Sequence, residues 1–250
     1  MIHYPQIDPV ALSIGPISIY WYGLTYVGGL IFAWWLGKQR AQLAQSPVSE
    51  EQIDDLIFYA ALGIVAGGRV GYALFYGAGS LWDDPLRVFR LWEGGMAFHG
   101  GFLGVVIAMW LFSRHQKIEF GALVDFIAPL APVGLALGRI GNFINQELWG
   151  RPADVPWAVV FPGDPLGLAR HPSQLYQFAM EGVLLFFVLL WYTRTPRPRW
   201  SAAGLFLLGY GLFRSLAEFF RAPDAHIGFD ALGWMTRGQL LSLPMIAVGA

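Results

Sequence analysis

The sequence FGALVDFIAPLAPVGLALG, residues 120–138, holds a single charged side chain, Asp125, in nineteen positions. A helix that crosses a bilayer needs about 20 mostly apolar residues, so a stretch of this kind predicts a membrane span. The residues that follow, GRIGNFINQELWGRP at 138–152, are instead rich in arginine, asparagine, glutamine and glutamate. A dense group of polar side chains at the end of an apolar segment indicates a functional site at the edge of the membrane.

The composition of the whole chain is typical of a membrane protein. Of its 250 residues, 56% are hydrophobic and 13% are charged, whereas about a quarter of the residues in a soluble domain are charged. The net charge of −1 gives no reason to expect binding to nucleic acid. Cysteine is absent, which excludes disulfides, cysteine metal ligands and a cysteine nucleophile within the chain.

Six stretches are long and apolar enough to cross a bilayer, and a seventh of eleven residues begins at Leu240. We therefore expect an all-α polytopic membrane protein with seven transmembrane helices, the seventh truncated in this chain. A single domain covers residues 1–250 in this interpretation. The predicted spans are Ile17–Gly37, Leu56–Tyr76, Gly94–Ser113, Phe120–Gly138, Gln174–Thr193, Ser201–Phe220 and Leu240–Ala250.

Lysine and arginine are concentrated in three short connections between the predicted spans, near Lys38, Arg114 and Arg194. The other connections hold as many basic residues, but they are several times longer and also contain acidic residues. Because short cytoplasmic loops carry an excess of Lys and Arg, this pattern places the N-terminus outside and the C-terminus inside. The first basic residue is Lys38, so the basic region of a cleavable signal is missing and we expect the first apolar segment to remain as an anchor.

The order of the spans then assigns a depth to each polar side chain within them. A charge inside the bilayer costs about 2.5–3.5 kcal/mol on insertion scales, so such residues are candidates for function. Only Asp125 falls in the inner part of the membrane. The other candidates share a level near the outer interface, which predicts a cationic pocket for an anionic lipid: Tyr22, Arg69, His99, Arg139, Glu181, Arg214 and Glu218.

Residues 139–173 cannot form one helix because they contain five prolines. We expect this segment to finish the fourth helix and then to fold over the outer face as a cap. If residues 139–147 are helical, their polar side chains lie within about 140° of one another and form one stripe: Arg139, Asn142, Gln146 and Glu147.

Each candidate also has a purely structural interpretation. Arg139 and Arg214 lie where an arginine can snorkel to the interface, although two guanidinium groups also match a phosphodiester. Arg214 and Glu218 are four residues apart, so an ion pair within one helix is a rival explanation. His99, in FHGGFLG at 98–104, is either a satisfied structural histidine or a proton acceptor. Paired glycines are most simply sites where helices pack closely: Gly28–Gly29, Gly67–Gly68 and Gly100–Gly101.

The stretch GRIGNFINQELWGRP closely resembles the signature of the bacterial prolipoprotein diacylglyceryl transferases. Further segments resemble this family in the same order over almost the whole chain: GPISIYWYGLTY (15–26), GGRVGYALFY (67–76), EGGMAFHGG (93–101), DFIAP (125–129), RHPSQLYQ (170–177) and GLFRSLAEFFRAPD (211–224). The chain departs from the family where the seventh helix and a basic tail should continue, and residues 151–170 look shorter than in some members.

The resemblance implies a multi-pass enzyme of the bacterial inner membrane whose active site opens to the periplasm. It implies transfer of the diacylglyceryl group of phosphatidylglycerol to the lipobox cysteine of a prolipoprotein. The product is a thioether, and glycerol 1-phosphate is released. The partners are then phosphatidylglycerol, the prolipoprotein signal peptide and membrane lipids. We expect no cofactor and no metal, and a monomer.

The resemblance also implies roles for individual residues. His99 is expected to take the proton of the substrate thiol. Arg139 and Arg214 are expected to bind the phosphate and to stabilise the leaving group. Arg69 joins the candidate substrate-binding residues by its depth alone. The positions that match the family's important residues are Tyr22, His99, Arg139, Asn142, Glu147, Gly150, Arg214 and Glu218.

Two other functions stay open on the sequence. A transporter or channel for an anion could use the same arginines, but its polar residues should continue toward the cytoplasm, where only Asp125 lies. A different transferase acting on a lipid phosphate would usually need an acidic metal site. The two pairs of neighbouring aspartates, Asp54–Asp55 and Asp83–Asp84, are expected on opposite sides of the membrane and so do not form one.

Overall fold

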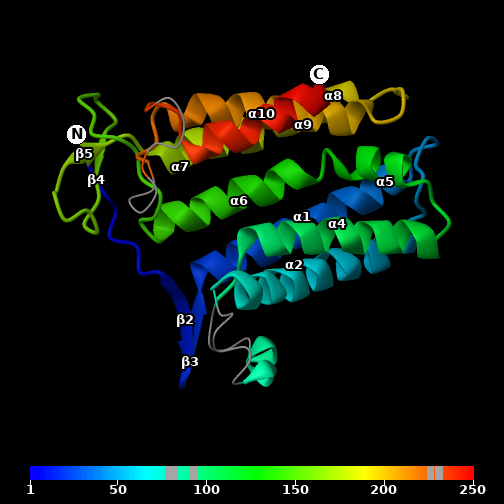
Figure 1. The fold of residues 1–250 in the computed structure, drawn as a ribbon, viewed down its shortest axis with the longest axis horizontal. Coiled ribbons are helices and arrows are strands. Elements are labelled where there is room, and N and C mark those ends of the chain that lie inside the picture. The colour runs from blue at the N-terminus through cyan, green and yellow to red at the C-terminus, as the bar shows by residue number, and fades with distance from the viewer. Residues whose placement is uncertain (77–83, 91–94, 224–227, 229–232) are drawn as a thin grey trace. The chain divides into compact units, whose positions relative to one another are not determined.

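The computed structural model describes residues 1–76, 84–90, 95–223, 228 and 233–250. These residues form two compact units. The first contains Met1–Ala33 and Ile127–Ala250, and the second contains Trp34–Phe126. Helix α1 (Trp21–Ala41) begins in the first unit and ends in the second. Figure 1 shows the helices and strands of both units.

The second unit is built around two long helices, α2 (Gln52–Tyr76) and α4 (Phe98–His115), which lie side by side. Glycines line their contact. A Cβ atom added to Gly67 would overlap the carbonyl oxygen of Gly100 and lie 2.7 Å from the Cα atom of Gly104. Any side chain there would push the helices apart, so the prediction that Gly67 and Gly100 mark close helix packing is confirmed. The unit also holds the 3₁₀ turn η1 (Pro85–Phe89) and nearly all of α5 (Phe120–Ile127).

The first unit contains the remaining helices. They are α6 (Ala131–Ile144), α7 (Ser173–Gln177), the π-helical segment η3 (Phe178–Leu184), α8 (Leu185–Tyr192), α9 (Ser201–Glu218) and α10 (Arg237–Gly249). Helices α9 and α10 lie side by side (Figure 1). Their contact is close because a Cβ atom on Gly211 would lie 3.1 Å from the carbonyl oxygen of Ser242. A further close contact, between Gly29 of α1 and Gly134 of α6, confirms the packing role predicted for the pair 28–29.

Two predicted spans have different boundaries in the structure. The first, Ile17–Gly37, begins as a strand, because residues 10–20 form a hairpin of β2 (Val10–Ile14) and β3 (Ile17–Tyr20) around Gly15 at φ 59°. Gly15 tolerates this left-handed backbone conformation. The fourth, Phe120–Gly138, is broken at residues 128–130 into α5 and α6, as Pro129 disfavours a continuous helix.

Length and composition support a membrane-spanning protein. Within the described ranges, two helical stretches, Gln52–Leu74 and Ser173–Tyr192, are long and apolar enough to cross a bilayer on their own. The pair α5 and α6 passes the same test if counted as one broken span. The count of seven transmembrane helices stays a prediction.

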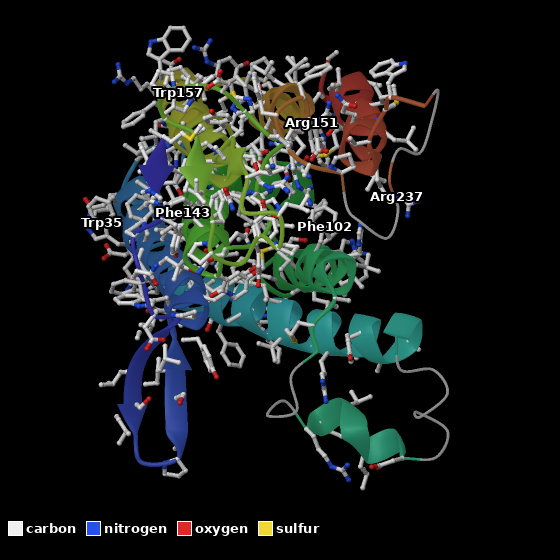
Figure 2. The ribbon with its side chains drawn as sticks, turned by 90° about the vertical axis from the view of Figure 1, so that its left-hand side faces the viewer. Trp35, Phe102, Phe143, Arg151, Trp157 and Arg237 are labelled. Atoms are coloured by element: carbon white, nitrogen blue, oxygen red, sulfur yellow. The ribbon has the colours of Figure 1, made fainter. Side chains whose placement is uncertain are left out.

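The segment between α6 and α7 folds into irregular structure with two short strands, β4 (Val159–Val160) and β5 (Ala169–Arg170). Strand β1 (Ile2–His3) from the start of the chain pairs in parallel with β4. Tyr4, Val159 and Phe161 form a small buried core here, against which Phe143 and Trp149 pack (Figure 2). The predicted helical architecture is confirmed in its main part, since most of the described residues are helical, but the prediction missed these short strands and the hairpin.

Candidate functional site

Four charged side chains from three helical elements meet inside the first unit. The Nη2 atom of Arg139 in α6 lies 3.0 Å from Oε2 of Glu181 in η3. Arg214 in α9 lies 3.8 Å from the other oxygen of Glu181 through Nη1, and 2.6 Å from Oε1 of Glu218 through Nη2. We call Arg139, Glu181, Arg214 and Glu218 the charged cluster.

The side chains of the charged cluster are largely shielded from solvent, which strengthens their electrostatic interactions. The side chains of Glu181 and Glu218 are 0% and 2% exposed, and those of Arg139 and Arg214 are 16% and 12% exposed. The two arginines therefore do not snorkel to the surface as isolated anchors. The predicted rival interpretation, an ion pair between Arg214 and Glu218, is confirmed. It does not exclude ligand binding, because Arg214 also faces Glu181 on another element.

The beginning of α10 closes around Glu218. Thr236, the N-cap of α10, donates its hydroxyl hydrogen to Oε2 of Glu218 over 2.6 Å. Arg221 donates from Nη1 to Oε1 of the same carboxylate over 3.0 Å. A Cβ atom on Gly238 would lie 2.7 Å from Glu218, so glycine lets the helix approach this closely. With Arg221 included, three arginines face two glutamates, which leaves one formal positive charge to attract an anion.

The position of Glu181 depends on an unusual helix segment. Residues 178–184 are π-helical between the α-helical turns of α7 and α8. Such segments are rare and are frequent at functional sites. Gly182, next to Glu181, packs so closely against Ala136 of α6 that an added Cβ atom would overlap the Cβ atom of Ala136. This contact brings the backbone of η3 next to the helix that carries Arg139.

Tyr22 and Asn142 form a second polar group in the same unit. The hydroxyl of Tyr22 lies 3.2 Å from the hydroxyl of Tyr26 and interacts with the side chain of Asn142. Asn142 donates from Nδ2 to Oε2 of Glu147 over 3.1 Å. A Cβ atom on Gly141 would lie 2.8 Å from the Tyr22 ring, so the ring packs directly on α6.

The predicted polar stripe on residues 139–147 is present only in part. Helix α6 ends at Ile144, so Arg139 and Asn142 are helical, whereas Gln146 has a left-handed backbone at φ 56° and Glu147 follows the helix. Glu147 still faces Asn142 because the chain turns back after the helix. Gln146 instead accepts a hydrogen bond from the backbone of Gly163 and helps to fold the connecting segment.

Gly150 is a point of close backbone packing. Its N–H donates to the carbonyl oxygen of His171 over 2.9 Å, and a Cβ atom on it would lie 2.6 Å from the carbonyl oxygen of Phe220. The next residue, Arg151, donates its backbone N–H to the same Phe220 carbonyl over 2.8 Å. These contacts attach the connecting segment to the chain just after the end of α9 at Glu218.

The connecting segment has an ion pair of its own. Arg170 donates from Nε and Nη2 to both oxygens of Asp164, over 2.7 and 3.0 Å. The hydrogen bonds from Arg170 hold the pKa of Asp164 below its usual value. Nearby, burial lowers the pKa of His171. The Nδ1 atom of this histidine lies 3.0 Å from the hydroxyl of Tyr176, which accepts a hydrogen bond from the half-exposed indole of Trp157 (Figure 2).

Arg69 and His99 belong to the second unit. Arg69 is buried and donates to three backbone carbonyl oxygens, those of Val88, Arg90 and Gly95, over 3.0, 2.6 and 3.1 Å. These contacts favour a structural role, and its predicted part in substrate binding stays a prediction. His99 is exposed in the first turn of α4. His99 and the charged cluster belong to different units, so the predicted proximity of the two stays a prediction as well.

The structure also identifies residues that the sequence prediction omitted. Glu181 was named among the polar residues of the predicted outer level but was given no role, although it faces both arginines. Tyr210 interacts electrostatically with Arg139, and its spacing of four residues from Arg214 was a usable signal of a shared helix face. Among the described residues, no group of His, Asp and Glu side chains is arranged to hold a metal ion. Asp83 of the second aspartate pair lies outside the described residues.

Comparison with known proteins assigns the chain to a family. The family model described as prolipoprotein diacylglyceryl transferase matches residues 9–250. The chain belongs to this family. Three similar relatives, each named phosphatidylglycerol–prolipoprotein diacylglyceryl transferase, align over the full length of the chain. The protein of Teredinibacter turnerae is 56% identical with 91% of its own length aligned, that of Azotobacter vinelandii 55% with 94%, and that of Pseudomonas syringae pv. syringae 56% with 93%.

The two arginines of the charged cluster lie in segments that resemble the family. Arg139 lies in the stretch GRIGNFINQELWGRP and Arg214 in GLFRSLAEFFRAPD, two of the segments that carry the family resemblance. These segments come from α6 and α9, and the structure joins them through Glu181. Guanidinium groups such as those of Arg139 and Arg214 match the oxygens of a phosphate.

Proposed function

We propose that this protein transfers the diacylglyceryl group of phosphatidylglycerol to the lipobox cysteine thiol of a prolipoprotein. The reaction forms a thioether and releases glycerol 1-phosphate. The observation that carries this proposal is the pair of partly buried arginines, Arg139 and Arg214, on either side of the fully buried carboxylate of Glu181. Membership of the family supplies the reaction, and the arginines supply a place for the lipid phosphate.

The two arginines bind the phosphate of the lipid. A guanidinium group offers planar, paired N–H donors that match phosphate oxygens. In the unliganded protein Glu181 offsets the repulsion between the two positive groups. When the glyceryl carbon–oxygen bond breaks, negative charge collects on the departing phosphate, and Arg139 and Arg214 stabilise it in a site with little water. Glu218 and Tyr210 orient them through the contacts described above.

His99 acts as the base that generates the nucleophile. A cysteine thiol has a pKa of about 8.5, so a base that takes its proton increases the thiolate fraction at neutral pH. The sulfur then attacks the glyceryl carbon that bears the phosphate oxygen. The carbon–sulfur bond forms, the carbon–oxygen bond breaks, and the electron pair leaves with glycerol 1-phosphate. The absence of cysteine from this chain fits a direct transfer to the thiol of the substrate.

The other candidate residues support this arrangement. Tyr22, Asn142 and Glu147 form the polar group next to α6 and position the lipid headgroup. Gly150 lets the connecting segment between α6 and α7 approach the end of α9. Residues 139–173 act as a periplasmic cap. Arg69 acts indirectly, because it holds the carbonyl of Gly95, four residues before His99.

The proposed membrane topology is supported by the distribution of lysine and arginine between the predicted spans. The protein is a multi-pass protein of the bacterial inner membrane, with its N-terminus in the periplasm and its C-terminus in the cytoplasm. The active site opens toward the periplasm, where the lipobox cysteine of an exported protein becomes accessible. The enzyme works as a monomer in a single domain of seven helices, without cofactor or metal.

Mass spectrometry of a lipobox peptide tests this proposal. The purified protein is incubated with the peptide and vesicles that contain phosphatidylglycerol, and the diacylglyceryl adduct on cysteine is measured. Arg139→Ala is expected to reduce adduct formation by about 100-fold or more, while the exposed Arg194→Ala serves as a control that keeps full activity. Absence of the adduct with the wild-type protein would refute the proposed reaction.

A further inference from the structure

One side of the helix formed by α7 and η3 carries three fully buried polar residues. Gln174, Gln177 and Glu181 have no exposed surface at all. Their spacing of three and four residues places them on one face of the helix, within about a quarter of its circumference. Glu181 is part of the charged cluster, so the two glutamines extend a polar surface away from it. We call Gln174 and Gln177 the amide pair.

The amide pair is incompletely hydrogen-bonded among the described residues. Gln174 uses its Nε2 atom on the carbonyl oxygen of Glu147, but its Oε1 atom has no partner there. Gln177 has no partner for either Nε2 or Oε1. A buried polar group without a hydrogen bond costs about 1–3 kcal/mol on mutational scales, and more than nine in ten such groups in proteins are paired. Three unpaired amide atoms on one face therefore indicate that something polar binds them.

The neighbours of the amide pair indicate which chemical group of the ligand binds there. At one end Gln174 contacts Glu147, the residue that also binds Asn142. At the other end Glu181 contacts Arg139 and Arg214. Gln177 lies between these ends, one helical turn from Glu181. An amide offers both a donor and an acceptor, and it carries no charge, so it matches a hydroxyl group rather than a second phosphate.

We propose that Gln177, assisted by Gln174, binds the hydroxyl groups of the glycerol headgroup while Arg139 and Arg214 bind the lipid phosphate. This inference rests on the proposed function and identifies how the enzyme selects its lipid. A headgroup of three carbons attached to the phosphate is comparable in length with one helical turn of about 5.4 Å. Gln177 lies about one helical turn along the same helix from Glu181, the residue that both arginines face.

This arrangement makes lipid selection a matter of hydrogen bonding. A site built to hydrogen-bond a hydroxyl rejects an analogue that lacks it, because its own buried polar groups are then left unpaired. Gln177 is fully buried, so the headgroup reaches it only when neighbouring side chains move apart. A lipid without headgroup hydroxyls forms no hydrogen bonds that offset the cost of this movement, so it is expected to be a poor substrate.

The test compares two lipids that share the same phosphate and acyl chains. Phosphatidylglycerol has two headgroup hydroxyls, and phosphatidylpropanol has the same three carbons without them. The adduct on a lipobox peptide is measured for each lipid, and kcat/KM is obtained for wild type, Gln177→Met and Gln177→Asn. Methionine is similar to glutamine in length and offers no strong hydrogen bond, whereas asparagine keeps the amide on a shorter chain. Gln42→Met, at an exposed position, is the matched control.

We expect wild type and Gln42→Met to prefer phosphatidylglycerol by at least tenfold, which corresponds to about one hydrogen bond to a buried polar group. Gln177→Met should lose at least tenfold more activity with phosphatidylglycerol than with phosphatidylpropanol, and Gln177→Asn should fall between. If Gln177→Met does not fold, the Asn variant carries the same comparison.

The possible failures are distinguishable. Equal losses with both lipids would show that Gln177 has only a structural role and would overturn the inference, while the proposed reaction would stand. A wild-type protein that uses both lipids equally would also overturn it. A wild-type protein that forms no adduct from phosphatidylglycerol would refute the proposed function, and the inference with it.

Discussion

Buried arginines occur in both units, but they are bonded in different ways. Arg69 in the second unit donates to three backbone carbonyl oxygens within reach of its own helix end. Arg139 and Arg214 in the first unit face the carboxylate of Glu181, and Nη1 of Arg214 reaches it only at 3.8 Å, beyond hydrogen-bond distance. The three carbonyl contacts of Arg69 fix a loop. Nη1 of Arg214, by contrast, has no hydrogen-bond acceptor among the described residues, so this donor is available for an anionic ligand.

Replacing the shared carboxylate should have the largest effect on stability. In Glu181→Gln, Arg139 and Arg214 stay close together without the negative charge between them. Loss of one partner of a buried ion pair costs about 3–5 kcal/mol, so thermal unfolding in detergent should shift strongly downward. Added phosphatidylglycerol should restore part of the loss, because its phosphate replaces the missing charge.

Glu51→Gln is the control, since Glu51 is exposed and its replacement should leave the unfolding temperature nearly unchanged. A Glu181→Gln protein with unchanged stability would contradict the interpretation that Glu181 balances the two arginines. A loss of stability without rescue by the lipid would separate this structural role from phosphate binding.

Arg69→Met should have a smaller effect, mainly on stability. It leaves the carbonyl oxygens of Val88, Arg90 and Gly95 without the donor that they share, at a cost of about 3 kcal/mol in total. Lipid binding, measured separately at a temperature where the variant is folded, should stay close to that of wild type. A loss of phosphatidylglycerol affinity as large as that of an Arg139 variant would place Arg69 in the binding site after all.

The ion pair of the connecting segment should have the smallest effect and a distinct pH dependence. The pKa of Asp164 is lowered in the folded protein, so the contribution of this pair is present above the pKa of an unfolded aspartate and is lost as the pH falls through the lower folded value. Wild type should therefore lose stability below about pH 4. Asp164→Asn should be less stable by about 2 kcal/mol at pH 7, less than for a fully buried pair, and should lack this acid step.

Thermal unfolding of both proteins between pH 3 and 7 measures the difference. If the two curves stay parallel at acid pH, Arg170 does not stabilise the folded segment through the charge of Asp164.

Sequence reasoning identified the helices more reliably than the contacts between them. The apolar runs located α2, α4 and α9 within a few residues, because helix length follows from the thickness of the membrane. Sequence reasoning placed Ile17–Tyr20 in the first helix, whereas these residues form strand β3. A short apolar run is compatible with a strand or a helix until its partner is known. Strand β1 has only two residues and pairs with β4, more than 150 residues away, so no local pattern predicted it.

The site was predictable where residues share one helix. Arg214 and Glu218 are four positions apart, and their ion pair was foreseen as an alternative. Glu181 was grouped with the two arginines by its predicted depth, which stays a prediction, but its contact with Arg139 depends on a π-helical segment and on the close approach of Gly182 to α6. The amide pair was missed because two glutamines in an apolar helix look like minor interruptions until their burial and lack of partners are known.

The central claim is that the arginines of the first unit, and not Arg69, bind the lipid phosphate. Its most direct test is kcat/KM for thioether formation in Arg139→Lys and Arg69→Lys, measured side by side at a temperature where both are folded. Lysine keeps the charge but loses the paired donors. We predict a loss of about 100-fold or more for Arg139→Lys and less than about tenfold for Arg69→Lys. Equal losses in the two variants would contradict the account.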